Sequence, residues 1–288
     1  MAKLSFIGLG VMGAPMAGHL ADAGHDVTVF NRSADKADAW VARYRGRTAA
    51  SSAAAAEGAD AVFTCVGADA DLAEVTLGSD GAFAAMRAGA LFVDHTTVSA
   101  TIARRLAAEG AERGLLVVDA PVSGGQAGAE KGALSIMCGG THEALGAARP
   151  LMESYAARIV HVGEAGAGQQ TKMVNQIAIA GVIQGVAEAL RFAQAAGLDT
   201  DKVFEAVSAG AAGSWQMQNR WATMARDEFD FGFAVDWMRK DLGLALDEAR
   251  GNGATLPTAA LVDQFYAEVQ AMGGARQDTS SIIRRLGR

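Results

Sequence analysis

Lys172 and Asn175 are the two side chains whose types and spacing point most directly to a reaction. They belong to the segment Gly-Gln-Gln-Thr-Lys-Met-Val-Asn, which opens a long apolar stretch without proline. Residues three apart share one face of a helix, so this amine and this amide could together bind a carbonyl oxygen and protonate it. On spacing alone a solvated surface lysine is the commoner explanation, and both interpretations stay open at this point.

A second candidate is the loop Pro-Val-Ser-Gly-Gly, which follows the apolar run 115–120. Such a loop at the carboxyl end of a strand can curl its backbone N–H groups into an anion-binding nest. The hydroxyl of Ser123 and the amides of Gly124 and Gly125 would suit a small carboxylate. Because a Gly-Gly pair usually marks only a turn, the loop by itself is a weak signal.

A glycine-rich turn near the N-terminus predicts a nucleotide site. The apolar run 4–7 breaks into Gly-x-Gly-x-x-Gly, and residues 12–23 follow with the pattern of a helix. In a dinucleotide-binding turn the first glycine makes the bend, the second admits the pyrophosphate and the third lets the helix pack on the strand. The alternative is a glycine turn that binds no nucleotide. We expect the cofactor to contact the whole loop: Gly8, Leu9, Gly10, Val11, Met12 and Gly13.

The second predicted strand, 26–30, ends at Asn31, Arg32 and Ser33. NAD-binding folds usually carry an acid near this point for the ribose 2′-hydroxyl, whereas here an arginine follows. A guanidinium can hold a 2′-phosphate with two parallel hydrogen bonds, and one charged hydrogen bond is worth about 1.5–3 kcal/mol. These residues therefore favour NADP over NAD, and the alternative is a solvated arginine beside a turn.

Further apolar runs at 61–66, 91–94 and 115–120 alternate with helical stretches, which predicts a parallel sheet flanked by helices. Ligands of such sheets bind outside the carboxyl ends of the strands. That rule places Val66, Gly67 and Thr96 on the cofactor side, with Thr96 the best candidate to contact a ribose. We expect His95 to be a structural histidine rather than a catalyst.

The domain organisation follows from where this alternation stops. An α/β domain that binds NAD(P) is predicted over residues 1–164, and the rest of the chain, 165–288, reads as helical throughout. Its first helix, 169–195, would span about 40 Å at 1.5 Å per residue and could join the two domains. The remainder predicts an all-helical domain for substrate binding or oligomerisation.

Composition excludes several classes of protein. Half of the 288 residues are hydrophobic, and the net charge of −7 argues against a nucleic-acid surface. Cys65 and Cys138 are the two cysteines, and we expect both to be thiols in a reducing compartment. We find no targeting presequence and no uncharged apolar stretch with membrane character. The sequence thus predicts a cytoplasmic protein without a membrane partner, and we expect no metal at the site.

Taken together, four motifs resemble the β-hydroxyacid dehydrogenases, the family of 3-hydroxyisobutyrate dehydrogenase, tartronate semialdehyde reductase and glyoxylate/succinic semialdehyde reductase. The resemblance covers essentially the whole chain. It implies a Rossmann-type domain, a long interdomain helix, an all-α domain, an active site between the domains and a homodimer or homotetramer. The motifs are Gly-Leu-Gly-Val-Met-Gly (8–13), Asp-Ala-Pro-Val-Ser-Gly-Gly (119–125), Gly-x-x-x-Lys-x-x-Asn (168–175) and Lys-Asp-Leu (240–242).

The resemblance also implies roles for individual residues. Lys172 matches the catalytic lysine, Asn175 the amide that helps to hold the substrate, and Thr96 the hydroxyl at the nicotinamide ribose. Ser123, Gly124 and Gly125 match the loop that binds the substrate carboxylate. Lys240 matches a lysine near the nicotinamide, while Phe233 and Asp241 fall where the family has a cofactor-side aromatic and an acid.

We therefore predict an NADP(H)-preferring oxidoreductase that interconverts a small β-hydroxyacid and its semialdehyde, or reduces a short acid aldehyde. Hydride would move between the nicotinamide and the carbonyl carbon while Lys172 acts as general acid or base. A free lysine has a pKa near 10.4, so we expect burial and the nearby charge of Lys240 to lower the pKa of Lys172.

Rival interpretations remain at this stage. One is a 3-hydroxyisobutyrate dehydrogenase that uses NAD, and another is a non-catalytic nucleotide sensor on the same fold. The related 6-phosphogluconate dehydrogenases have a larger helical domain and a histidine where Val174 stands, and imine reductases usually replace the lysine. The motifs do not choose among glyoxylate, succinic, tartronate and methylmalonate semialdehydes.

Overall fold

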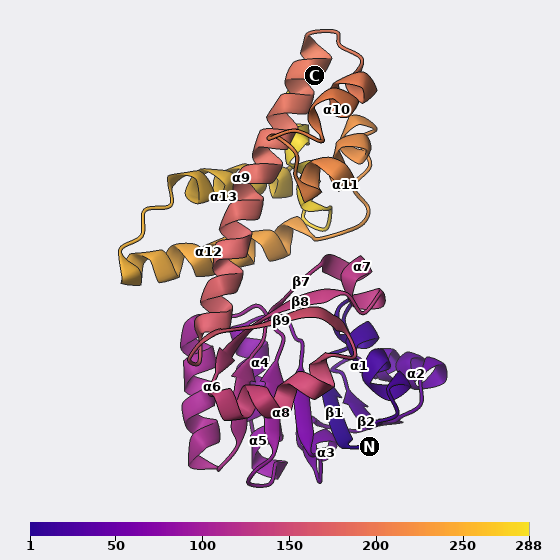
Figure 1. Ribbon diagram of the computed structural model, residues 1–288, viewed down its shortest axis with the longest axis vertical. Coiled ribbons are helices and arrows are strands. Elements are labelled where there is room, and N and C mark those ends of the chain that lie inside the picture. The colour runs from indigo at the N-terminus through magenta and orange to yellow at the C-terminus, as the bar shows by residue number, and fades with distance from the viewer. Residues whose placement is uncertain (288) are drawn as a thin grey trace. The chain divides into compact units, whose positions relative to one another are not determined.

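The protein divides into two compact units, Met1–Lys172 and Met173–Arg288. The computed structural model describes residues 1–287. Figure 1 shows strands and helices in the first unit and helices in the second.

The first unit is built on one nine-stranded sheet, with strand order β3-β2-β1-β4-β5-β6-β8-β7 and β9 paired to β8. The strands from β3 to β6 are parallel to their neighbours, as the sequence predicts. The strands are β1 (Lys3–Ile7), β2 (Asp26–Phe30), β3 (Arg47–Thr48), β4 (Ala61–Thr64), β5 (Leu91–Asp94), β6 (Leu116–Asp119), β7 (Val122–Ser123), β8 (Leu134–Gly140) and β9 (Ala156–Gly163).

The end of the sheet differs from the parallel strands β3 to β6. Strand β8 pairs antiparallel with both β6 and β7, and β9 runs parallel to β8. Between β6 and β8 the chain passes only through β7 and the short helix α7 (Gly125–Glu130). Strand β7 lies in this connection and itself pairs antiparallel with β8.

Helices cover both faces of this sheet, because alternate residues of each strand point to opposite sides. Phe6, Phe63 and Val93 pack in a core with residues of α1, α2 and α8. Ile7 and Phe92 lie in a second core that α4 and α6 help to form. The helices are α1 (Gly13–Asp22), α2 (Ala34–Arg43), α3 (Ser52–Ala56), α4 (Asp69–Leu77), α5 (Ala82–Ala85), α6 (Ala100–Glu112) and α8 (His142–Met152).

The second unit is all-helical over its described residues, 173–287. Its core collects buried side chains such as Ile183, Trp221, Leu242 and Tyr266 from four different helices. The elements are the greater part of α9 (Ala167–Ala195), then α10 (Thr200–Val207), α11 (Trp215–Ala225), α12 (Val235–Asn252), α13 (Pro257–Ala271) and the 3₁₀ helix η1 (Thr279–Arg285). This is the Rossmann-type domain, long helix and helical domain that the sequence predicts.

Helix α9 has an apolar composition. Among the described residues it is the one helix that is long and apolar enough to cross a membrane, although 44% of its most apolar window is buried inside the protein. Ile183, Val186 and Leu190 contribute to the core of the second unit. Packing of a core helix therefore accounts for this apolar composition.

Both cysteines are free thiols, as expected. Cys138 is buried in β8, and this burial raises its pKa to about 12. A thiol with so high a pKa is protonated at neutral pH and is a poor nucleophile.

Candidate functional site

The glycine loop has the geometry that its motif predicts. Gly8 has φ +97°, and a Cβ there would meet the carbonyl oxygen of Cys65. A Cβ on Gly13 would meet the carbonyl oxygen of Gly8, so that α1 can start only if this position has no side chain. By contrast, a Cβ on Gly10 would have nothing within 4 Å. Two glycines thus form the turn, and the third leaves open space at which a ligand can approach the backbone.

Asn31 holds this loop from the next strand. Its Oδ1 accepts a hydrogen bond from the Leu9 N–H at 2.9 Å, and its Nδ2 donates to the Ser33 carbonyl at 3.0 Å. Two of the predicted cofactor residues are thereby fixed to each other. The main-chain N–H of Leu9 is thereby bonded, and in the first turn of α1 the N–H groups of Ala14 and Met16 donate to the carbonyls of Gly10 and Met12.

Arg32 lies on the surface beside this loop. Its side chain is 89% exposed and pairs with Asp71 at 3.0 Å. An ion pair this exposed contributes little stability, so the guanidinium can move to another anion at small cost. Ser33 is the N-cap residue of α2 and makes no side-chain capping bond.

Thr96 is held by the ends of the two neighbouring strands. Asp94 Oδ1 accepts hydrogen bonds from the Thr64 hydroxyl at 2.7 Å and from the Thr96 N–H at 3.0 Å. The Thr96 Oγ1 accepts from the Val66 N–H at 3.0 Å. This bond uses the main-chain donor of Val66 and leaves the hydroxyl proton of Thr96 to be donated to a ligand.

Asp94 and His95, which precede this hydroxyl, are both buried. Burial raises the pKa of Asp94 to about 7, although hydrogen bonds from Thr96 and Thr64 oppose the change and the charge of Asp119 adds to it. Burial also lowers the pKa of His95 to about 4. The ring of His95 bonds the Ala120 carbonyl at 2.7 Å and the Tyr155 hydroxyl at 2.9 Å, so His95 is the satisfied structural histidine that we expected.

Lys172 lies against the Ser123 loop. Its side chain is 8% exposed, and its Nζ donates to the Val122 carbonyl at 2.9 Å. Ser123 follows Val122 directly, and Gly124 and Gly125 then take φ values of +135° and +61°. The first-turn amides of α7 have no intrahelical acceptor. A buried amine and a loop with amides available for an anion are thus brought together, which excludes the solvated-lysine interpretation.

In the second unit, Asn175 begins a chain of polar contacts. Its Nδ2 donates to Gln176 Oε1 at 2.7 Å, and Gln176 Nε2 donates to Asp241 Oδ2 at 2.7 Å. Asp241 Oδ1 lies 3.2 Å from Lys240 Nζ, and Lys240 also lies over the ring of Trp237 at 5.7 Å. Asn175 and Lys240 are therefore oriented by the same two buried side chains.

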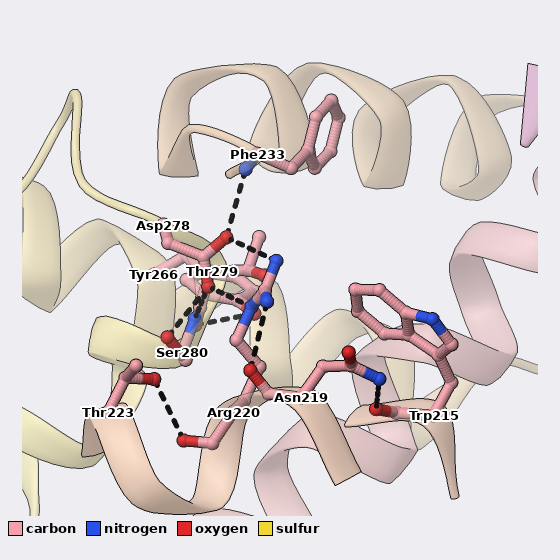
Figure 2. Close-up of polar contacts among 9 residues, drawn as sticks. All are labelled: Trp215, Asn219, Arg220, Thr223, Phe233, Tyr266, Asp278, Thr279 and Ser280. Atoms are coloured by element: carbon pink, nitrogen blue, oxygen red, sulfur yellow. Dashed lines mark hydrogen bonds and ion pairs between the residues drawn. The ribbon is translucent and has the colours of Figure 1, made fainter. Parts of the chain in front are cut away.

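Phe233 is positioned by Asp278, as Figure 2 shows. The Phe233 N–H donates to Asp278 Oδ2 at 2.9 Å, and in Figure 2 its ring points away from the carboxylate. Asp278 also accepts from Arg220 Nε at 2.9 Å. The guanidinium of Arg220 lies 4.9 Å from the ring of Trp215 and 4.9 Å from that of Phe231.

Comparison with known proteins decides the family. A family model for the NAD binding domain of 6-phosphogluconate dehydrogenase matches residues 3–163. A second model, described as the NAD-binding domain of NADP-dependent 3-hydroxyisobutyrate dehydrogenase, matches residues 166–286. The 3-hydroxyisobutyrate dehydrogenase of Pseudomonas aeruginosa is 36% identical over 93% of this chain and 92% of that protein. The chain belongs to the 3-hydroxyisobutyrate dehydrogenase family.

Other members of the 3-hydroxyisobutyrate dehydrogenase family match over the full length. The NAD-dependent L-serine dehydrogenase of Pseudomonas aeruginosa is 38% identical over 99% of this chain and 98% of its own length. The solved structure of 3-hydroxyisobutyrate dehydrogenase from Mycobacterium tuberculosis with L-serine has a TM-score of 0.90 and 34% identity, with complete coverage of both chains. As a member of this family, the protein is an NAD(P)-dependent oxidoreductase.

The residues present fit the nicotinamide dinucleotide that the 3-hydroxyisobutyrate dehydrogenase family implies. The open backbone at Gly10, just before the N-terminus of α1, suits a pyrophosphate. The hydroxyl of Thr96 lies at the carboxyl end of the sheet, where its oxygen accepts from the Val66 N–H. Which side chains contact the cofactor stays a prediction.

Sequence reasoning missed the buried amides Gln169 and Gln176 and the carboxylate Asp278. Gln169 bonds the loop after β5, Gln176 orients Asn175, and Asp278 positions Phe233. The sequence does hold a signal for Gln169 and Gln176. Together with Lys172 they recur at helical spacing in an apolar stretch and so share one face of the helix.

Proposed function

We propose that this member of the family is an NADP(H)-preferring enzyme that interconverts a small 3-hydroxyacid and its semialdehyde. The observation that carries the proposal is the Lys172 amine, which is buried and lies 2.9 Å from the carbonyl directly before Ser123. A proton donor is thereby placed beside a loop that suits a carboxylate. A small acid with an oxygen on the β-carbon has both groups that such an arrangement needs.

The chain's own residues then have defined tasks. The Ser123 hydroxyl and the amides of Gly124 and Gly125 hold the substrate carboxylate. The Lys172 ammonium donates a proton to the substrate oxygen during reduction, and the neutral amine removes it during oxidation. The bound nicotinamide supplies or accepts the hydride. Contacts of Asn175 with substrate, and of Phe233 and Lys240 with cofactor, are part of the proposal and rest on the family resemblance.

The named relatives support the substrate class. One is a dehydrogenase of L-serine, another of 3-hydroxyisobutyrate, and a solved relative was studied with L-serine. Both compounds carry a carboxylate and a hydroxyl on the β-carbon. Glyoxylate, which lacks a β-carbon, tests the lower size limit of the site.

The preference for NADP rests on Arg32. This exposed guanidinium stands where an acid would repel a 2′-phosphate. One relative is named as NAD-dependent, so the use of NAD by this chain is the competing proposal.

The test is a rate measurement with both reduced cofactors against succinic, tartronate and methylmalonate semialdehydes and glyoxylate, and with both oxidised cofactors against L-serine and 3-hydroxyisobutyrate. Faster turnover with the phosphorylated cofactor supports the whole proposal. Faster turnover with NADH would support the proposed reaction and overturn the proposed role of Arg32. Tight NADPH binding without turnover on any substrate would instead indicate a nucleotide sensor.

A further inference from the structure

Gln169 joins the first turn of α9 to the loop that carries Thr96. Its side chain is fully buried, and both of its polar atoms bond the main chain of that loop. The Oε1 accepts from the Val98 N–H at 3.1 Å, and the Nε2 donates to the Thr96 carbonyl at 2.7 Å. These bonds hold the side chain in place, because a buried polar group without a hydrogen-bond partner lowers the stability of the fold.

Asp119 fixes the same turn of α9 from the end of β6. Its Oδ1 accepts from the Gly166 N–H at 2.8 Å and its Oδ2 from the Gln169 N–H at 3.0 Å. These bonds satisfy N–H groups that the start of a helix leaves without partners. A Cβ on Gly168 would lie 2.5 Å from the Met137 carbonyl oxygen and 2.7 Å from that of Asp119, so the turn has no room to shift toward the sheet.

The Thr96 loop is held as firmly as the helix. The Thr96 N–H is bonded to Asp94 and its carbonyl to Gln169. On the helix, Lys172 lies three residues after Gln169 and shares its face. One side chain therefore connects the turn that carries the amine to the loop that carries the hydroxyl.

We propose that Gln169 is a positioning residue that holds the Lys172 amine and the Thr96 hydroxyl in one fixed geometry. The proposal rests on the proposed function, in which Lys172 moves the proton and Thr96 binds the nicotinamide ribose. Gln169 contacts neither ligand. Its loss therefore impairs the alignment of cofactor and proton donor and leaves carboxylate binding at Ser123 largely intact.

The first test compares Gln169→Met with Gln170→Met in the full-length enzyme. Methionine is similar in length and makes no comparable hydrogen bonds, and Gln170 is the exposed neighbouring amide. For Gln169→Met we expect kcat to fall roughly 10- to 100-fold, as misalignment of reacting groups does, with the substrate KM nearly unchanged. NADPH affinity, measured by calorimetry without substrate, should fall, and the primary isotope effect with 4-deuterated NADPH should rise. Gln170→Met should match the wild type.

A second variant, Gln169→Glu, adds a readout that a merely structural role would not move. A protonated carboxyl can donate to the Thr96 carbonyl and accept from the Val98 N–H as the amide does, whereas the ionised form cannot donate. The kcat of this variant relative to the wild type should therefore rise as the pH falls. Asp94 and Asp119, which bond the same loop and turn, are present in both enzymes, so the ratio removes their titration.

The outcomes separate this proposal from the proposed function. A folded Gln169→Met enzyme with wild-type kcat and NADPH affinity overturns the positioning role. Should that variant fail to fold, a ratio for Gln169→Glu that does not change with pH overturns it instead. Lys172→Met is measured in parallel: if it retains kcat, the proton donor was misassigned and both proposals fail, whereas its inactivity beside an unaffected Gln169→Met removes only the positioning role.

Discussion

Asp119 in the first unit and Asp278 in the second are both buried carboxylates on which distant parts of the chain converge. Asp278 is 1% exposed at its side chain and pairs with the guanidinium of Arg220, besides accepting from the main-chain N–H groups of Phe233 and Ser280. Asp119 accepts from the main-chain N–H groups of Gly166 and Gln169 at the start of α9. One charge is balanced by a full cation, the other by the partial charges of a helix start.

This difference determines which change would perturb each carboxylate. A paired buried charge is destabilising mainly when its partner is removed. A carboxylate that only dipoles stabilise keeps a raised pKa, and burial does raise the pKa of Asp119 although the N–H bonds oppose it. We therefore expect the stability of the second unit to depend on Arg220, the partner of Asp278. The stability of the first unit should instead depend on pH through Asp94 and Asp119, the carboxylates at the ends of β5 and β6.

The largest effect should come from Arg220→Met, which leaves Asp278 buried without its cation. We expect the free energy of unfolding of the second unit to fall by about 3–5 kcal/mol. Urea unfolding followed by tryptophan fluorescence measures it, since Trp215, Trp221 and Trp237 all lie in that unit. The matched control is Arg226→Met, whose exposed pair with Glu228 should contribute little to stability. Equal effects of the two substitutions would contradict the comparison.

Asp94→Asn tests the pH response of a strand-end carboxylate. The folded-state pKa of Asp94 is raised from 3.8 to about 7, so its contribution to stability is present below pH 3.8 and is lost as the pH rises to about 7. The pKa of His95 is lowered from 6.5 to about 4, so its contribution is present above pH 6.5 and is lost as the pH falls to about 4. In the wild type these two slopes oppose each other.

In the Asp94→Asn variant the slope of His95 should remain. Relative to the wild type, the variant should gain stability as the pH rises from about 4 to 7, by a few kcal/mol at about 1.36 kcal/mol per unit of pKa. Urea midpoints at several pH values measure this difference. A difference that is constant across the range would mean that the carboxyl of Asp94 titrates normally.

Asp119→Asn tests the helix start directly. An asparagine keeps one acceptor oxygen and places an NH₂ group opposite a backbone N–H, so one of the two bonds is lost. We expect about 1–3 kcal/mol of destabilisation and a lower kcat, because the turn before Lys172 is loosened. Steady-state kinetics and urea unfolding on one preparation measure both. Destabilisation with unchanged kcat would show that Asp119 supports only the fold.

The smallest stability effect should come from Arg32→Ala, because the Arg32–Asp71 pair is exposed. The free energy of unfolding should change by less than about 1 kcal/mol. The ratio of kcat/KM with NADPH to that with NADH should fall about 10-fold or more, since a charged hydrogen bond is worth about 1.5–3 kcal/mol. An unchanged ratio would leave the 2′-phosphate proposal without support.

Local signals in the sequence were enough to predict most of the fold. The turn at Gly8 and the alternation of apolar runs with helices depend on neighbours in the chain, and the structure confirms them. The reversal at β8 depends on how Val118 and Asp119 pair with Gly140 and Gly139, which no local pattern encodes. Gln169 was missed for the same reason, because its partners Thr96 and Val98 lie more than seventy residues earlier.

The bond from Asn31 to Leu9 has a consequence for how cofactor choice can change. Position 31 belongs to the scaffold of the glycine loop, whereas its neighbour Arg32 is on the surface and contributes little to stability. Mutational drift can therefore sample side chains at position 32 with the fold intact, while position 31 stays constrained. An engineer who wants to redirect the enzyme between the two nicotinamide cofactors should randomise Arg32 and Ser33 and retain Asn31.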